Sequence, residues 1–379
     1  MEISLVIMKS LYIKIGLLIC ITSFAQQKKN DVDLQENTLD YELELVVPEV
    51  EIAWGMTWLP DDSMLYTEKS GELIHFKDGK KNKINNVPAV DTRGQGGLLD
   101  IELHPNYTEN GWIYISYSTN TGKGNGAHTA VLRAKIESNT LTSIQQLYKG
   151  SPNVDTPYHF GSRIEFDSEC YLYFSIGERG ERETNPQDIN KDGGKIYRLH
   201  DDGSIPDDNP FVDSKNARKA IFSYGHRNPQ GMDLHPVTGE LWINEHGPRG
   251  GDEINIIKKG ANYGWPVITY GLNYSGTKIT DISSKEGMEQ PIYYWTPSIA
   301  PCGMTFVTGN TYPKLKDKLL VSSLKFAYVE LLTIENKKVT KREKIAQDIG
   351  RVRNVKQAPN GYIYVSIEDE GIFKLKSKK

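Results

Sequence analysis

The chain repeats one pattern of hydrophobic and polar positions six times. Each copy has a short apolar stretch, then a turn rich in Pro, Asp, Asn or Gly, then a segment in which aromatic and aliphatic residues alternate. A period of two along such a segment is typical of a β-strand with side chains on both faces. The pattern predicts these strands at residues 64–68, 111–116, 171–176, 239–244, 318–322 and 362–366.

The spacing of the repeats favours one architecture. The hairpins recur roughly 45 to 75 residues apart, which suits four-stranded blades of about 40 to 50 residues with loops of variable length. We therefore predict an all-β fold, a six-bladed β-propeller, over residues 41–379; a long β-sandwich is the alternative. The propeller bears on function because its loops gather at one end of a central channel.

The N-terminal segment is typical of a secretory signal peptide over residues 1–25. Lys9 and Lys14 precede or enter an apolar run, and a small-x-small triplet suited to cleavage ends at Ala25. A transmembrane anchor is the alternative, but the run is too short for about 30 Å of hydrocarbon. We expect residues 26–40 to be a flexible lead-in. The mature chain is then exported, periplasmic or secreted, with no stable insertion in a membrane.

Composition and cysteines narrow the possible partners. The 45 Lys and Arg against 49 Asp and Glu give a net charge of −4, which does not suggest a nucleic-acid partner. Beyond Cys20, inside the leader, the cysteines are Cys170 and Cys302, and they lack the spacing of a metal site. We expect two separate buried thiols, with a disulfide as the alternative.

Two glycine-rich loops flank the fourth repeat, at residues 224–231 and 244–253. They hold more ionisable groups than a purely structural turn requires. Glycine lets a backbone approach a ligand closely, and Pro248 has no N–H to repel a cation near the neighbouring carbonyls. Such carbonyls, with Asp252 and Glu253 close by, suit a hard cation such as calcium.

A basic cluster lies late in the chain, at Lys325, Arg351 and Arg353. The two arginines alternate, so both project from one face of an extended segment. Their guanidiniums repel each other unless an anion sits between them, and their planar forks match carboxylates or phosphates. The alternative is a solvated strand edge with acidic partners nearby.

His159 is the candidate general base. It precedes the third repeat at the place that Gln95 occupies before the second, so both are expected at the same end of a propeller. An imidazole with a pKa near 6.5 can take a proton from a sugar hydroxyl. A structural histidine is the alternative.

Six motifs together resemble a known family. From about Trp54 to Leu375 the chain is similar to the quinoprotein aldose sugar dehydrogenases, relatives of the soluble glucose dehydrogenase that uses pyrroloquinoline quinone (PQQ). The motifs are Gly-Gln-Gly-Gly-Leu-Leu, His-Phe-Gly-Ser-Arg, Gly-His-Arg-Asn-Pro-Gln-Gly, Glu-His-Gly-Pro-Arg-Gly-Gly-Asp-Glu, Asn-Tyr-Gly-Trp-Pro and a late Arg-Val-Arg.

The resemblance implies an oxidoreductase that acts on the CH–OH group at the anomeric carbon of an aldose and forms the lactone. His159 would take the hydroxyl proton while hydride passes to PQQ. Arg227 and Asn228 would hold the quinone carbonyls, and Gln95 and Tyr274 would complete the cradle. The three carboxylates of PQQ would explain the convergence of the basic cluster. An unidentified electron acceptor would reoxidise the cofactor.

The resemblance also implies calcium. One ion would bind the backbone carbonyls of Gly247 and Pro248 and act as a Lewis acid, and a structural ion would use Glu253 and the backbone oxygen of Tyr263. The chain departs from the soluble glucose dehydrogenase at Tyr158, where an aspartate precedes the base, so the group that orients the imidazole is not evident. A calcium-dependent lactonase and a non-catalytic extracellular binding module are the alternative functions.

Overall fold

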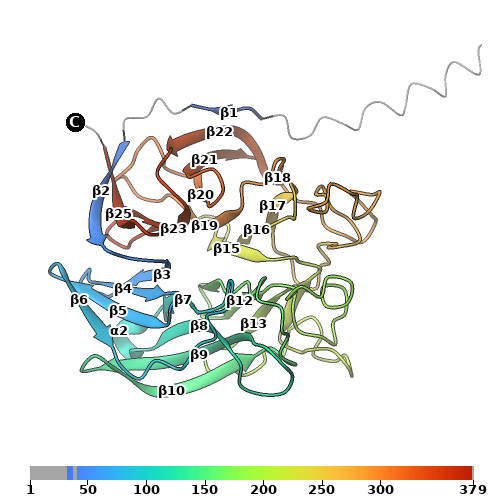
Figure 1. The fold of residues 1–379 in the computed structure, drawn as a ribbon, viewed down its shortest axis with the longest axis horizontal. Coiled ribbons are helices and arrows are strands. Elements are labelled where there is room, and N and C mark those ends of the chain that lie inside the picture. The colour runs from blue at the N-terminus through green and yellow to red at the C-terminus, as the bar shows by residue number, and fades with distance from the viewer. Residues whose placement is uncertain (1–31, 37–40, 378–379) are drawn as a thin grey trace, which may run out of the picture. The chain divides into compact units, whose positions relative to one another are not determined.

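A computed structural model describes residues 32–36 and 41–377. The predicted signal peptide lies outside this part of the chain. From Leu34 onward the chain forms one compact unit of six sheets that radiate around a central axis (Figure 1). All strand pairs within the sheets are antiparallel except that of β1 (Leu34–Gln35) with β22 (Lys338–Ala346). The prediction of a six-bladed β-propeller is confirmed, and a single β-sandwich is excluded.

The first three blades lie between residues 53 and 224, and their strands are given from the inner strand outward. Blade 1 has β3 (Ala53–Trp58), β4 (Met64–Glu68), β5 (Glu72–Lys77) and β6 (Lys80–Ile84). Blade 2 has β7 (Leu98–Leu103), β8 (Ile113–Thr119), β9 (His128–Glu137) and β10 (Thr140–Lys149), with the short helix α2 (Tyr107–Asn110) between β7 and β8. Blade 3 has β11 (Ile164–Phe166), β12 (Leu172–Ile176), β13 (Lys195–Leu199) and β14 (Ile221–Tyr224).

The remaining blades follow in the same order. Blade 4 has β15 (Pro229–Leu234), β16 (Leu241–Glu245), β17 (Asp252–Ile256) and β18 (Tyr293–Trp295). Blade 5 has β19 (Pro301–Phe306), β20 (Leu319–Ser323), β21 (Tyr328–Glu335) and β22 (Lys338–Ala346). Blade 6 has β23 (Val352–Gln357), β24 (Ile363–Ile367) and β25 (Gly371–Ser377).

The N-terminal part of the unit supplies two more strands. β2 (Tyr41–Pro48) pairs antiparallel with β25 and so becomes the outer strand of blade 6, which closes the ring (Figure 1). β1 (Leu34–Gln35) pairs in parallel with β22. The lead-in that we expected to be flexible therefore contributes a short strand within its described residues.

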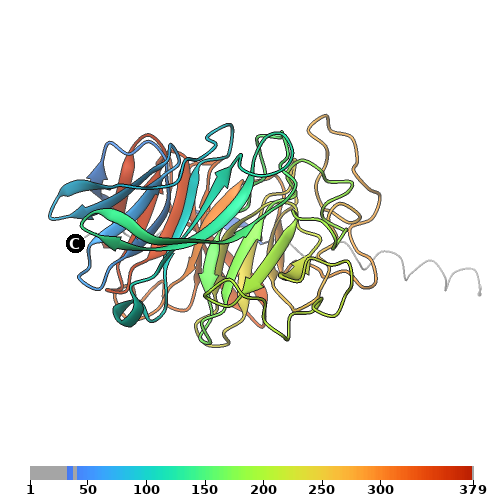
Figure 2. The same cartoon turned by 90° about the horizontal axis from the view of Figure 1, so that it is seen from below.

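The core lies between the blades rather than on one face of a sheet. The second strand of each blade is buried along its whole length, on both faces, because a neighbouring blade packs against each side (Figure 2). This explains why alternation of residue types in the sequence does not become alternation of burial in the structure.

A repeated polar contact joins consecutive blades. In five blades, the fourth residue of the second strand donates a side-chain hydrogen bond to a backbone carbonyl at the start of the next blade. We call this contact a clasp. The five clasps are Thr67 to Leu99 O, Ser116 to Ser162 O, Ser175 to Pro229 O, Asn244 to Cys302 O and Ser366 to Ala53 O. The equivalent residue of blade 5, Ser322, is fully buried, and its hydroxyl has no partner among the described residues.

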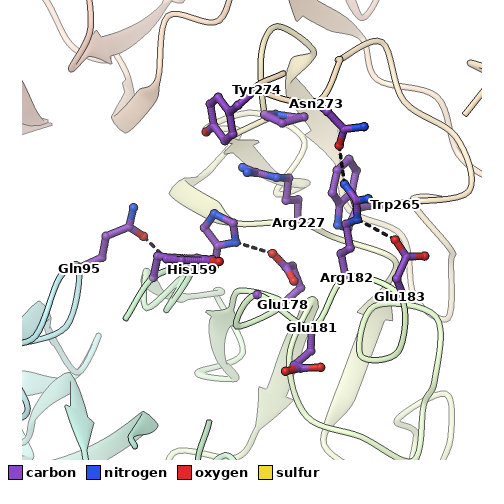
Figure 3. A pocket seen from close by; sticks show the side chains of 13 residues that line it. Gln95, His159, Glu178, Glu181, Arg182, Glu183, Arg227, Trp265, Asn273 and Tyr274 are labelled. Carbon is purple, nitrogen blue, oxygen red and sulfur yellow. Dashed lines mark hydrogen bonds and ion pairs between the residues drawn. The ribbon is translucent and has the colours of Figure 1, made fainter. Parts of the chain in front are cut away.

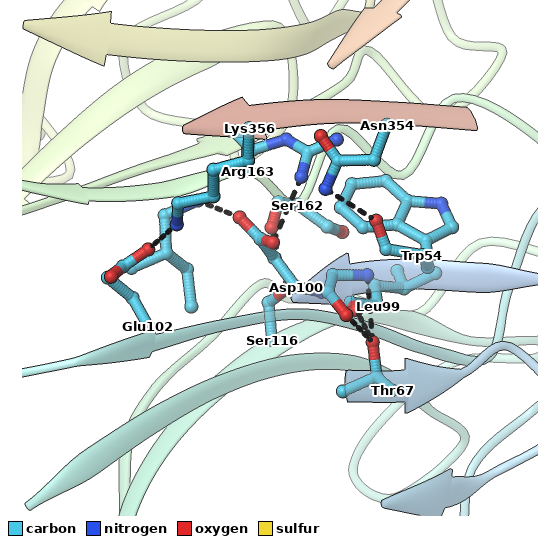
Figure 4. Close-up of polar contacts among 12 residues, drawn as sticks. Trp54, Thr67, Leu99, Asp100, Glu102, Ser116, Ser162, Arg163, Asn354 and Lys356 are labelled. Atoms are coloured by element: carbon cyan, nitrogen blue, oxygen red, sulfur yellow. Dashed lines mark hydrogen bonds and ion pairs between the residues drawn. The ribbon is translucent and has the colours of Figure 1, made fainter. Parts of the chain in front are cut away.

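The channel side of the ring is also held by buried charge. Arg163 pairs with Asp100 of blade 2 at 3.0 Å and lies 4.2 Å from the ring of Trp54 in blade 1 (Figure 4). It also donates to Gln230 O of blade 4 at 3.0 Å. Its Nη2 also lies 4.0 Å from Sγ of Cys302 in blade 5, so one guanidinium contacts four other blades. Removing one partner of such a buried pair would leave an uncompensated charge, so this contact couples the inner strands of different blades.

Two further observations concern predictions made from the sequence. Both Cys170 and Cys302 are free thiols, as expected, although only Cys302 is buried and Cys170 is half-buried. Among the described residues, no helix has the length and apolar character needed to cross a membrane.

Candidate functional site

The loops at one end of the propeller enclose a cavity of about 570 Å³. Most of these loops precede inner strands or follow second strands, two kinds of loop that lie at the same end of every blade. The long segment between β17 and β18 adds Trp265, Asn273 and Tyr274 to the lining. Five of the candidate site residues from the sequence line this cavity together: Gln95, His159, Arg227, Pro248 and Tyr274. Figure 3 shows all of them except Pro248 as labelled side chains.

A carboxylate lies directly behind the candidate base. Nδ1 of His159 is hydrogen-bonded to Oε1 of Glu178, which follows β12 (Figure 3). The side chain of His159 is 12% exposed and that of Glu178 is 2% exposed, so the imidazole faces the cavity while the carboxylate is covered. The sequence did not show which group orients the imidazole, because Tyr158 stands where the soluble glucose dehydrogenase has an aspartate. Glu178 can take this part, since it can fix the tautomer and orientation of the ring.

The backbone around His159 is equally constrained. Its N–H donates to Oε1 of Gln95 at 2.7 Å, and the residue has a left-handed φ of 59°. Oδ1 of Asn228 accepts from the N–H of Gly161 at 3.1 Å. Gln95 and Asn228, both predicted to bind a cofactor, therefore also support the loop that carries the base.

Burial and neighbouring charges set the protonation of the pair. Burial, followed by the charges of Arg227 and Arg179, lowers the pKa of His159 well below its ordinary value. Burial raises the pKa of Glu178 to about 7, against the opposing effect of Arg227. At neutral pH the imidazole is uncharged, as a general base requires.

Arg227 connects the base to the fourth repeat. Its guanidinium donates to the carbonyls of His246 and Gly247 at 2.9 and 3.0 Å, and its backbone N–H donates to Oε2 of Glu245 at 2.7 Å. The carbonyl of Arg227 accepts from the N–H of Glu178 at 2.8 Å. Arg227 is thus held rigidly beside His159, with its positive charge in the cavity wall.

A second cavity of about 400 Å³ shares Gln95 with the first. Its wall holds three cationic side chains, those of Lys69, Arg351 and Arg353, against one carboxylate, Glu368. Arg351 donates to Oε2 of Glu368 at 2.6 Å, and Arg353 donates to Oε1 at 2.9 Å. The acidic partner that the sequence left as an alternative is therefore present, yet the wall keeps a surplus of positive charge.

Lys325 does not join this cluster. It is exposed, its ammonium lies 4.9 Å from the ring of Phe326, and it lines neither cavity among the described residues. Tyr274 reaches the larger cavity from the long segment between β17 and β18, and is 74% exposed.

The predicted calcium ligands divide between two places. Pro248 lines the large cavity, whereas Gly247, Glu253 and Tyr263 line an adjoining pocket of about 10 Å³ that also contacts Arg227. The carboxylate of Glu253 shares one donor, Nδ2 of Asn255, with a second buried carboxylate, Glu245, at 3.1 and 3.2 Å. A pocket of this size admits one water-sized species.

Side chains alone do not form a metal centre here. Within the described part of the chain, no group of three or more His, Cys, Asp or Glu is arranged to hold a metal ion. Calcium at either place would therefore need backbone carbonyls in addition to carboxylates, which is ordinary coordination for this hard cation.

Comparison with known proteins gives consistent matches over nearly the whole propeller. The profile of the glucose/sorbosone dehydrogenase family matches residues 50–374. The aldose sugar dehydrogenase YliI of Escherichia coli (strain K12) is 41% identical over 93% of this chain and 94% of its own. Quinoprotein glucose dehydrogenase B of Acinetobacter calcoaceticus is 30% identical over 65% of this chain and 56% of its own.

The fold agrees with these sequence matches. The crystal structure of the soluble aldose sugar dehydrogenase from Escherichia coli in the apo-form superposes with a TM-score of 0.85 and 39% identity. The superposition covers 89% of this chain and all of that one.

Proposed function

Because the chain belongs to the glucose/sorbosone dehydrogenase family of oxidoreductases, we propose that it oxidises an aldose at the anomeric carbon to the lactone, with PQQ and calcium. The observation that carries this proposal is the pair formed by His159 and Glu178 at the wall of a cavity large enough for a cofactor and a sugar. Export, a sugar substrate and a separate electron acceptor belong to the same proposal.

The protein's own groups account for the proton. Ionised Glu178 accepts a hydrogen bond from the Nδ1–H group of His159. This leaves the lone pair of Nε2 free to take the proton of the anomeric hydroxyl. The carboxylate then stabilises the imidazolium that forms. Arg227 stands beside the pair and offers a positive charge where negative charge develops.

The residues present fit a planar tricarboxylate such as PQQ. The two cavities meet at Gln95, and the smaller one has three cations against one anion in its wall. Arg227 and Asn228 would hold the quinone end, while Arg351 and Arg353 would hold carboxylates. Bound PQQ supplies a two-electron centre that accepts hydride.

The fit to calcium rests on oxygen donors. Gly247, Pro248, Glu253 and Tyr263 offer carbonyl and carboxylate oxygens around Arg227, and Glu245 and Glu253 bring two carboxylates to one amide donor. A cation between these carboxylates would relieve their repulsion. Bound calcium would supply Lewis acidity.

A lactonase is the less favoured alternative. Glu178, Glu181 and Glu183 do bring carboxylates to the large cavity, as a calcium-dependent hydrolase requires. However, Glu178 is taken up by His159, and Glu183 pairs with Arg182 at 2.7 Å. A non-catalytic binding module would not need a covered carboxylate behind an imidazole.

Reconstitution tests the proposal. The purified chain would be mixed with PQQ and calcium, then given a panel of aldoses and an artificial electron-accepting dye. We expect dye reduction that depends on sugar, PQQ and calcium together. The absence of dye reduction with every sugar, together with no absorbance change when PQQ is added, would overturn it.

A histidine variant tests the assigned base. His159→Gln should retain PQQ binding and lose at least about 100-fold in kcat, the usual contribution of a general base. His75→Gln is the matched control, because His75 lies on β5 in blade 1 and bonds to Ser63 at 2.8 Å, outside both cavities. Dye reduction by His159→Gln at the rate of the control would remove His159 from this role.

A further inference from the structure

Arg179 follows Glu178 directly and is completely buried. Its guanidinium binds backbone carbonyls: that of Tyr158, that of Thr156 at 2.6 Å and that of Ala127 at 3.4 Å. Among the described residues it forms no ion pair, and its Nε has no partner. A full positive charge is therefore held inside the protein by the loop that carries the candidate base.

The contacts of Arg179 lie on both sides of His159. The guanidinium bonds to the carbonyl of Tyr158, the residue before it, and its Cζ lies 3.5 Å from the ring centroid of Phe160, the residue after it. His159 itself has a left-handed backbone with a φ of 59°, a conformation that is unfavourable for a residue other than glycine. Arg179 thus secures an unfavourable backbone conformation from its two neighbours.

The two loops approach so closely that side chains are excluded between them. A Cβ on Gly177 would lie 2.3 Å from the carbonyl oxygen of His159, and a Cβ on Gly180 would lie 2.5 Å from the side chain of Thr156. Glycines on each side of Glu178 and Arg179 therefore let this pair reach the base.

The charge of Arg179 acts on both members of the proton-transfer pair. Burial lowers its own pKa to about 9, so it is still cationic at neutral pH. After burial and Arg227, it is the next influence that lowers the pKa of His159, and it also lowers the pKa of Glu178. It favours a neutral imidazole and an ionised carboxylate, which is the state that can accept a proton.

We propose that Arg179 is a positioning residue of the active site, which holds the backbone of His159 in place and keeps the pair of His159 and Glu178 ready to accept a proton. The assignment rests on the proposed function for its catalytic meaning. The contacts it invokes belong to the chain alone, so they can be tested without cofactor.

The first test measures the imidazole in the protein without PQQ. The pKa of His159 would be followed by NMR of histidine-labelled protein, with its signal assigned from the His159→Gln variant. Arg179→Met should raise this pKa by about one unit, because a nearby positive charge is lost. Arg179→Lys, which keeps the charge, should leave the pKa close to that of the unaltered protein.

The matched control is Arg198→Met. Arg198 lies on β13 in the same blade, is 6% exposed, and lies 4.6 Å from the ring of Tyr171, so it is another buried arginine against an aromatic ring. Its loss should lower the melting temperature without moving the pKa of His159. An unchanged pKa in Arg179→Met, or an equal shift in both methionine variants, would overturn the proposal.

Activity of the reconstituted enzyme gives the second readout. Both Arg179 variants should lower kcat by about 10- to 100-fold with KM within about threefold, since the base is misplaced while the binding groups remain. Only Arg179→Met should also move the acid limb of the pH profile upward. Wild-type kcat in both variants would overturn the positioning role. If the unaltered chain oxidises no sugar, the proposed function fails, and the NMR result still decides whether Arg179 controls the pair.

Discussion

At the residue scale, the imidazole of His159 lies between a covered carboxylate and a cavity wall with arginines. Among the described residues, Glu178 is the buried group that is hydrogen-bonded to the ring of His159, and Oε2 of Glu178 has no hydrogen-bond partner. Its negative charge is therefore available to the imidazole. A substitution of Glu178 therefore tests the proton-transfer pair more directly than a substitution of a residue that only lines the cavity.

Glu178→Gln should lower kcat by about 100-fold, because an amide cannot stabilise the imidazolium with a negative charge. KM should change little, since Glu178 lies behind the base. Steady-state dye reduction with the reconstituted enzyme checks this. Glu183→Gln is the control: it lines the same cavity, but its carboxylate pairs with Arg182. Equal rates for the two variants would contradict the role of Glu178.

The pH dependence follows from the same pair. The pKa of Glu178 is raised to about 7 by burial. Below this pH the protonated acid would donate to Nδ1 of His159, which places the ring proton on Nε2 and removes the base. The kcat/KM should therefore rise with pH through about 7. A pH profile recorded with Glu178→Gln should lack this limb, and a limb that persists there belongs to another group.

The site was predictable where residue types with clear chemistry stand in glycine-rich loops. Gln95, His159 and Arg227 were found in this way, and the structure brings them together. Glu178 was missed because nothing in the sequence pairs it with His159; its one signal was a carboxylate just after a predicted strand, at the same end of the blade. Lys325 was grouped with the arginines by its place in the chain, but its ammonium lies against the ring of Phe326 and it does not line the cavity that holds Arg351 and Arg353.

At the element scale, the clasps show why the repeat is recognisable. The hydroxyl of Ser116 donates to Ser162 O at 2.6 Å and accepts from the N–H of Asp100 at 2.9 Å, so it joins two blades and its own inner strand. The contact requires a polar side chain at this position of the second strand, so the same position is polar in each repeat. Ser322 occupies the equivalent place without a partner among the described residues.

The two serines make a matched pair for stability measurements. Ser116→Ala should lower the free energy of unfolding by about 1 to 3 kcal/mol, because it leaves a buried carbonyl and a buried N–H unpaired. Ser322→Ala should change it by less than about 0.5 kcal/mol, or stabilise the fold, since it removes a buried hydroxyl with no bond to lose. Urea unfolding followed by fluorescence compares them. A larger loss for Ser322→Ala would mean that its hydroxyl is bonded.

The second strands were predicted to within two or three residues at each end, since their hydrophobic alternation is strong. The outer strands were not predicted individually. Segments such as β6 and β10 are largely polar and exposed, and their pairing depends on the strand beside them. The hydrophobic pattern of the sequence therefore predicts the buried strands, which pack against neighbouring blades, and not the outer strands.

At the scale of the whole molecule, the ring is closed by strands from distant parts of the chain. Seven residues of β2 pair with β25, with Tyr41 opposite Ser377. No local pattern announces such a contact, because its partners are separated by nearly the full length of the propeller. Without β2, β25 would present an open strand edge to solvent.

Removal of residues 1–48 should lower the melting temperature by about 10 °C or more and promote association, compared with removal of residues 1–40, which keeps β2. Thermal unfolding and gel filtration of the two truncated chains measure this. Equal melting temperatures would mean that blade 6 is stable with three strands.

Because the ring is closed, the chain could start at a different blade and keep the same cyclic order of blades. Tyr41 and Ser377 are neighbours in space, so a short linker can join them, and new ends can be opened at the exposed turn of Asp78 and Gly79 between β5 and β6. Such a circular permutant should assemble the same ring and reduce dye at a rate close to that of the unpermuted enzyme. Its candidate active site depends on the closed ring of blades and not on where the two chain ends lie.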